Sequence, residues 1–292
     1  MEEKELMNKF IQNRIAIGLS SNTIDSYCYC LRDFFSYLCK NKVESVDSSI
    51  IEAYFIYLRG KYSQYTIKDK FAILHAYYNY LVAEGYIAES PVKMRKPKIP
   101  KELSRCFSDE EMYKIMQYFS NIDEFVKLRD YTCICVLLST GLRRNELLNL
   151  DMKSIYGNNF IVLGKGGKQR FVPISKSLEK VLKKYIPERN KIAYTEKLIV
   201  TREGKNLTAG GLRTIFKKIS TAVGIGGKRF SSHTFRHFFA TKSIQQGMDI
   251  ASLQRILGHS SISTTGIYLN LADNMIEEIN NRTNPLNFYK II

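Results

Sequence analysis

Apolar residues recur at steps of three and four through most of the first 90 positions, which is the pattern of amphipathic helices. Between Thr23 and Lys40 the repeat is clear, and its apolar members are Ile24, Tyr27, Cys28, Leu31, Phe34, Phe35 and Leu38. The same pattern predicts three more helices, over Glu5–Ile17, Ser48–Arg59 and Thr66–Glu84. We therefore expect residues 1–90 to form a four-helix unit.

The pattern beyond residue 105 is also mostly helical, with one exception. Ser108-Asp-Glu-Glu111 has the form of a capping box at the start of a helix. Further helices are predicted over Asp123–Ser139, Lys176–Tyr185, Thr208–Val223, Thr234–Gln246 and Asp249–Leu257. The exception is a hairpin in which Asn159–Leu163 and Lys168–Ile174 flank a glycine-rich turn. The expected fold is mainly α with a small β-hairpin or sheet.

The charge of the chain indicates a polyanionic partner. The formal net charge is +16, and a charge this large raises the rate of encounter with DNA. Residues 1–100 hold 14 Lys and Arg against 11 Asp and Glu, a net +3, while the remainder holds 30 against 17, a net +13. The excess positive charge therefore lies in the second part of the chain.

A proline-rich segment from Pro91 to Lys101 separates the two parts. Its three prolines exclude a continuous helix and favour an extended path. Its basic residues are Lys93, Arg95, Lys96, Lys98 and Lys101. The segment is either a solvated linker or a basic strap on phosphates, and we favour the strap because it joins two candidate DNA-binding units.

The remaining composition excludes several other classes. No apolar run reaches the roughly 18 residues of a membrane span, and the first ten residues do not predict a secretory signal, so we expect a cytoplasmic protein. The six cysteines form no C-x-x-C pair and are expected to be reduced, mostly buried thiols. We expect neither a metal nor a cofactor.

The candidate chemistry gathers between residues 232 and 268. His233 and Arg236 stand three apart, His259 follows 23 residues after that arginine, and Tyr268 stands nine residues further on. Guanidinium groups match phosphate geometry, histidine transfers protons, and a tyrosine hydroxyl can attack phosphorus. We interpret the stretch as a site that holds a phosphodiester between cations and presents a tyrosine to it.

Two further candidates precede this stretch. Arg143 follows the helix-ending Gly141 at an exposed corner, although in isolation a salt bridge with Glu146 would explain it as well. Lys165 stands in the hairpin turn, where a solvated lysine is the alternative. A Walker-type phosphate loop is excluded because the chain has no G-x-x-x-x-G-K-[ST] motif.

Together these motifs resemble those of the tyrosine recombinases, also called phage-type integrases. The motifs are TGLRRNELLNL, GKGGKQRFVPI, HTFRH and LGHSSISTTGIY, in that order, after a helical first domain. The size and layout are most similar to the compact Xer-type members. Any one motif is weak, but the ordered set covers nearly the whole chain and is highly specific.

The resemblance implies a domain order and an assembly. It implies a core-DNA-binding domain over residues 1–90, a basic linker over 91–105, and a catalytic domain over 106–292 with a C-terminal tail for subunit exchange. The two domains would clamp double-stranded DNA, and a homotetramer would exchange strands through a Holliday junction. The amphipathic residues Met275 and Ile279 fit a tail that packs on a neighbouring subunit.

The resemblance also implies roles for particular residues. Arg143 and Arg236 would bind the scissile phosphate, and His259 would donate a hydrogen bond to it. Glu146 would support the residues around the phosphate. We expect His237 to pack rather than react, and the TGLR register disfavours Arg144 as a substitute for Arg143.

The reacting groups follow from the same resemblance. Lys165 would protonate the 5′ leaving oxygen, His233 would serve as an acid or base, and Tyr268 would form a 3′-phosphotyrosine.

Two alternatives remain beside a site-specific recombinase. One is a relaxation-only enzyme of the type IB topoisomerase kind, which the small helical first domain disfavours. The other is a non-catalytic DNA-binding accessory protein, which the presence of all six expected catalytic residues disfavours. The sequence leaves open the DNA target, the need for a partner recombinase, and the choice between integration or excision, inversion and dimer resolution.

Overall fold

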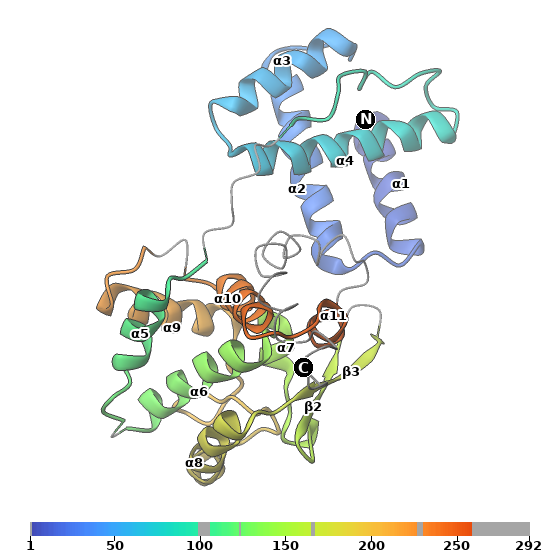
Figure 1. Cartoon of the computed structure of the whole chain (residues 1–292). Helices are drawn as coiled ribbons and strands as arrows, with labels where there is room; N and C mark the ends of the chain where they lie inside the picture. Colours follow the sequence, from blue (N-terminus) through green and yellow to red (C-terminus); the bar gives the residue numbers. More distant parts are fainter. Residues whose placement is uncertain (1, 99–105, 123, 165–166, 227–229, 259–292) are drawn as a thin grey trace, which may run out of the picture. The chain divides into compact units, whose positions relative to one another are not determined.

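The computed structural model describes residues 2–98, 106–122, 124–164, 167–226 and 230–258 (Figure 1). The chain divides into two compact units, Met1–Glu102 and Leu103–Ile292. Lys101, Lys165, His259 and Tyr268 lie outside the described residues, as do Met275 and Ile279. Within the described residues, no helix has the length and apolar character that a membrane span requires.

The first unit contains the four helices that the pattern predicts, with ends shifted by up to three residues. They are α1 (Glu2–Ala16), α2 (Ser21–Lys40), α3 (Ser48–Arg59) and α4 (Gln64–Ala83). Side chains of Ser20, Asp47 and Ser63 cap α2, α3 and α4 by accepting backbone N–H bonds in the first turn. Helix α4 packs against each of the other three.

The core of the first unit is aromatic and holds one buried ion pair. Phe10, Phe34 and Tyr54 are fully buried there. Lys70, which is also buried, places its Nζ 2.6 Å from Oδ2 of Asp33. The hydroxyl of Tyr54 donates to the same oxygen over 2.9 Å. Burial and this bond to an anionic group raise the pKa of Tyr54, so its hydroxyl stays a donor.

The second unit is built from helices around one small sheet. The helices are α5 (Asp109–Gln117), α6 (Phe125–Thr140), α7 (Arg144–Asn149), α8 (Lys176–Ile192), α9 (Ala209–Ala222), α10 (Ser232–Gln245) and α11 (Ile250–Leu257), with a 3₁₀ turn, η1, at Met152–Ser154. The antiparallel sheet has the order β1 (Ile155–Tyr156), β2 (Asn159–Leu163) and β3 (Gln169–Pro173). The predicted hairpin is therefore confirmed, and the two-residue strand β1 adds a third strand to it.

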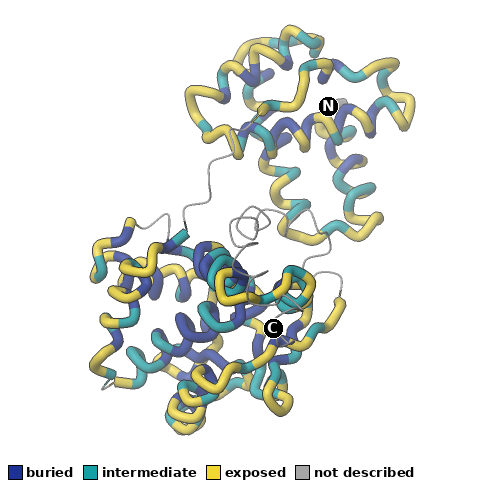
Figure 2. The backbone as a smooth tube through the Cα atoms, in the orientation of Figure 1, coloured by how far each residue is buried: buried dark blue, intermediate teal, exposed yellow. Residues whose placement is uncertain are grey.

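Helix α6 is the centre of this unit. Eight of its residues from Arg129 to Leu137, together with Thr140, are buried, and α8 and α10 pack against it. In Figure 2 the dark blue of buried residues runs along α6 and α10. The capping box at Ser108 and Glu111 is confirmed by reciprocal bonds of 2.9 and 3.1 Å.

The predicted end of α8 at Tyr185 is wrong. Pro187 lacks the N–H of a helical ladder, which usually ends or kinks a helix. The helix instead continues through Pro187 to Ile192. Beyond the proline, the buried Arg189 donates to the carbonyl oxygens of Thr195 and Lys197, which fixes the end of the helix to the following loop.

Candidate phosphate-binding site

Arg143 lies at the corner between α6 and α7. Helix α6 ends at Gly141, whose φ of 61° turns the chain sharply. Glu146, in the first turn of α7, then accepts two bonds from Arg143: one from its backbone N–H (2.8 Å) and one from Nη1 (3.0 Å). The salt bridge named above as the alternative explanation for Arg143 is present, and Glu146 fixes the backbone of Arg143 as well as its side chain.

Arg236 joins this corner to the end of α11. It is buried on α10, and its Nη1 donates to the carbonyl oxygen of Gly141 over 2.8 Å. Its Nη2 donates to the carbonyl oxygen of Leu257 over 2.7 Å. Nη1 of Arg143 reaches the same Leu257 oxygen at 3.5 Å. Two arginines that the motifs place 93 positions apart therefore meet at one carbonyl group.

Arg170 is a third arginine of this cluster, and it is not among the residues predicted for the site. It lies on β3, paired with Val162 of β2. Its Nη1 and Nη2 donate to the two oxygens of Glu146 over 3.0 and 2.9 Å, and its Nε donates to the carbonyl oxygen of Ile256 over 2.8 Å. The sequence signal for it was weak, because a single arginine in an exposed hairpin is ordinary.

The electrostatics of the cluster favour an ionised Glu146. Burial alone would raise the pKa of its carboxyl group, but the bonds from Arg170 and Arg143 outweigh burial and lower the pKa below the usual value. One carboxylate thus lies between two guanidinium groups, and Arg236 adds a third cation. The cluster carries net positive charge, as an anion-binding site requires.

His233 lies beside the arginines at the start of α10. Ser231 caps this helix, and His233 is exposed in its first turn. Burial of part of the ring lowers the pKa of His233, and the nearby charges of Arg236, Arg143 and Arg144 lower it further. The imidazole is therefore neutral at pH 7 and able to accept a proton. His233 also lines a surface hollow together with Arg143, Arg144 and Arg213.

His237 is one turn further along α10 and is half-buried. Burial lowers its pKa, with smaller contributions from His233 and Arg236. Both histidines of the HTFRH motif are therefore neutral at pH 7.

Gly164 and Gly258, which precede Lys165 and His259 in the chain, both line the edge of this site. Gly164, which precedes Lys165, donates its N–H to the carbonyl of Lys168 over 2.8 Å and so closes the base of the hairpin turn. Gly258, which precedes His259, is the C-cap of α11 with φ of 64°. Both ends border the pocket that Arg143, Glu146 and Arg170 line.

The predicted basic strap is described as far as Lys98. Residues 91–98 contain neither helix nor strand. Arg95, Lys96 and Lys98 are exposed, whereas Lys93 pairs with Glu89 over 2.9 Å.

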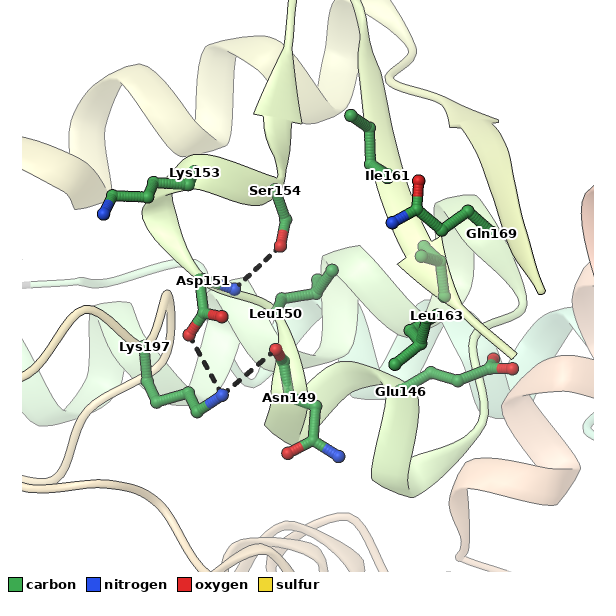
Figure 3. A pocket seen from close by; sticks show the side chains of 11 residues that line it. Glu146, Asn149, Leu150, Asp151, Lys153, Ser154, Ile161, Leu163, Gln169 and Lys197 are labelled. Atoms are coloured by element: carbon green, nitrogen blue, oxygen red, sulfur yellow. Dashed lines mark hydrogen bonds and ion pairs between the residues drawn. The ribbon is translucent and has the colours of Figure 1, made fainter. Parts of the chain in front are cut away.

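A second pocket reaches Glu146 from the side of η1 and β2 (Figure 3). Its charged residues include Asp151 and Lys197, paired over 3.0 Å, and Lys197 also donates to the carbonyl oxygen of Asn149 over 3.3 Å. Across the described ranges, we find no group of three or more His, Cys, Asp or Glu side chains placed to hold a metal ion.

Arg143, Arg170 and Arg236 gather around one carboxylate and the end of α11, which is the class of cationic site that suits a phosphate group. A model of the phage integrase family matches residues 105–275, and a model of the phage integrase N-terminal SAM-like domain matches residues 6–87. The chain therefore belongs to the phage integrase family, as an enzyme of the tyrosine recombinase type.

Two relatives that match nearly the whole chain agree with this placement. The chain is 34% identical to tyrosine recombinase XerC of Leptospira interrogans, over 96% of this chain and 93% of that protein. It is 31% identical to tyrosine recombinase XerA of Pyrococcus horikoshii, over 95% of this chain and 94% of the relative.

Solved structures share the fold. The XerH site-specific recombinase bound to a palindromic difH substrate, in a post-cleavage complex, superposes with a TM-score of 0.75 at 23% identity, over 95% of this chain and 83% of that one. A lambda integrase dimer bound to a COC′ core site gives a TM-score of 0.73 at 19% identity, over 88% and 95% of the two chains.

Proposed function

We propose that this protein cleaves and rejoins DNA strands at specific sites through a 3′-phosphotyrosine on Tyr268. The observation that carries the proposal is the meeting of Arg143 and Arg236 at the carbonyl of Leu257, at 3.5 and 2.7 Å. Two guanidinium groups held this close suit the non-bridging oxygens of one phosphodiester. The chain itself supplies the cations that stabilise the transition state.

The proposed reaction conserves the phosphodiester energy. The hydroxyl of Tyr268 attacks phosphorus while the neutral His233 accepts its proton, and the bond to the 5′ oxygen breaks. Lys165 gives that oxygen a proton, and His259 donates to the phosphate. A 5′ hydroxyl from another strand then reverses the step and releases the tyrosine, so rejoining needs no nucleotide cofactor.

The proposed assembly follows the domain order expected from the sequence. Residues 1–90 bind core DNA, the basic linker over residues 91–105 contacts phosphates, and residues 106–292 cleave. The substrate is double-stranded DNA in the cytoplasm. A homotetramer exchanges the strands through a Holliday junction. The DNA-bound XerH and lambda integrase structures support the choice of substrate.

Covalent capture tests the proposal. Wild type and Tyr268→Phe are incubated with suicide DNA that carries a nick near the candidate site, and adducts are resolved on denaturing gels. The expected result is an adduct with wild type and none with Tyr268→Phe, while both proteins bind the DNA equally. Tight binding without an adduct would support the accessory-protein alternative instead. Relaxation of plasmids that lack the site would point to a topoisomerase.

A further inference from the structure

The guanidinium group of Arg170 is bound within the protein through all three of its nitrogens. Its side chain is 12% exposed, against 38% for Arg143. Its three nitrogens all donate within the protein, to Ile256 and to both oxygens of Glu146. In contrast, the Arg143 side chain bonds to the described part of the chain only through Nη1.

The two arginines divide one carboxylate between them. Oε1 of Glu146 accepts from Nη1 of Arg143 and Nη1 of Arg170, each at 3.0 Å. Oε2 accepts from the backbone N–H of Arg143 at 2.8 Å and from Nη2 of Arg170 at 2.9 Å. Because a carboxylate offers about four acceptor sites, Glu146 is saturated. It cannot form a two-pronged pair with Arg143 while Arg170 is in place.

Removing Arg170 would change what Glu146 does. A lone arginine beside a buried carboxylate forms the bidentate pair that geometry favours. Arg143 would then direct two N–H donors and its positive charge to Glu146. Neither the donors nor the charge would remain available for the phosphate. Arg170 prevents this loss, because its guanidinium group neutralises Glu146 and leaves the charge of Arg143 for the phosphate.

Arg170 also fixes the end of α11. Its Nε holds the carbonyl of Ile256, next to the Leu257 carbonyl that Arg236 holds. A Cβ atom added at Gly258 would lie 3.0 to 3.1 Å from Cδ, Nε and Cζ of Arg170, so glycine lets this side chain pass. The chain continues directly from Gly258 into His259. The guanidinium group of Arg170 therefore joins β3, α7 and α11. Each of these elements is close in sequence to a proposed catalytic residue.

We infer that Arg170 is a positioning residue of the cleavage site, which occupies Glu146 so that the Arg143 guanidinium stays directed to the scissile phosphate. The inference rests on the proposed function. Arg170 acts through Arg143.

A double-mutant cycle tests this dependence. Single-turnover cleavage of suicide DNA at saturating protein is measured for wild type, Arg170→Met, Arg143→Ala and the double variant. Displacement of a catalytic group by about 1 Å costs on the order of 100-fold, which is the expected loss for Arg170→Met. In the Arg143→Ala background the same change should cost less than about threefold, because the group that it positions is gone. Equal losses in both backgrounds would overturn the inference, as would an unchanged rate for Arg170→Met.

Folding is controlled with a matched arginine. Arg189 is also buried and also donates to backbone carbonyls, but it lies on α8. Arg189→Met should lower the melting temperature and leave the cleavage rate of the folded fraction unchanged. If Arg170→Met does not fold, Arg170→Lys replaces it, since lysine keeps the charge and loses the fork. DNA affinity should change less than about threefold, because all three nitrogens of Arg170 donate within the protein.

A readout without DNA separates this inference from the proposed function. The ¹⁵N–¹H NMR signal of Arg143 Nε, assigned by its loss in Arg143→Lys, is followed during titration with inorganic phosphate. Wild type should show a saturable shift, and Arg170→Met should need several-fold more phosphate for the same shift. Identical titrations would overturn the inference whatever the DNA does. Failure of wild type to form an adduct would count only against the proposed function.

Discussion

The guanidinium group of Arg236 donates to the backbone carbonyl of Gly141 over 2.8 Å, across 95 positions of sequence. The bond ties α10 to the last turn of α6. Because Arg143 follows Gly141 by two residues, the bond also limits where Arg143 can lie. The glycine that ends α6 is therefore part of the support of the site.

Gly141→Ala should destabilise the protein more than an ordinary glycine substitution. A Cβ atom there would lie 2.5 Å from Cδ1 of Phe239 and 2.7 Å from Cδ2 of Leu257, at a φ of 61° that disfavours alanine. Overpacking and the left-handed conformation together predict a loss of about 2–4 kcal/mol in unfolding free energy. Urea denaturation measures it.

Gly157→Ala is the matched control for that substitution. Gly157 has a similar φ of 54°, but no heavy atom lies within 4 Å of the added Cβ. Only the conformational cost applies, which is about 1 kcal/mol. Equal losses at the two positions would show that crowding by Phe239 and Leu257 does not matter.

Stability should fall as the pH drops from 7.5 to 5.5. Burial, then neighbouring charges, lowers the pKa of His233 and of His237 in the folded protein. Between the ordinary histidine pKa of about 6.5 and the lower folded values, the unfolded chain binds more protons. The folded protein thus has its full stability above about pH 6.5, where both histidines are neutral in either state. It loses stability as the pH falls toward the lower pKa values of the folded state.

Urea denaturation of His237→Gln at a series of pH values tests this dependence. The variant should lose less stability than wild type over the same interval. His75→Gln, which replaces an exposed histidine on α4, is the control and should follow wild type. A wild-type curve that rises toward pH 5.5 would contradict the prediction.

The local pattern predicted the helices because their apolar spacing is a property of adjacent residues. It could also identify Arg143 and Arg236 through motifs. The motif GKGGKQRFVPI contains Arg170, but the pattern could not assign it a role, because its partners Glu146 and Ile256 lie 24 and 86 positions away. That contact depends on how β3, α7 and α11 pack, and no short stretch of sequence records it.

Asp33→Ala should destabilise the first unit strongly. It would leave the buried Lys70 ammonium without its carboxylate at 2.6 Å and the Tyr54 hydroxyl without its acceptor. Breaking a buried pair on one side costs about 3 kcal/mol or more. Glu179→Ala breaks the exposed pair with Lys183 and should have little effect. Thermal and urea unfolding measure both, and similar small losses would mean that the Asp33 pair is effectively solvated.

The basic strap should contribute to DNA affinity through salt-dependent phosphate contacts. Arg95, Lys96 and Lys98 are exposed in a segment without helix or strand. The logarithm of the DNA-binding constant falls as the logarithm of salt concentration rises, and each phosphate contact steepens this fall by about 0.9. If all three residues contact phosphates, replacing them with glutamine should make the slope shallower by about 2.7. Replacing Lys180, Lys183 and Lys184, three exposed lysines of α8, removes the same charge as a control. If the positive charge acts only by general attraction, both triple variants should lose the same DNA affinity. If the strap contacts phosphates directly, the strap variant should show a much larger change in salt slope than the α8 variant.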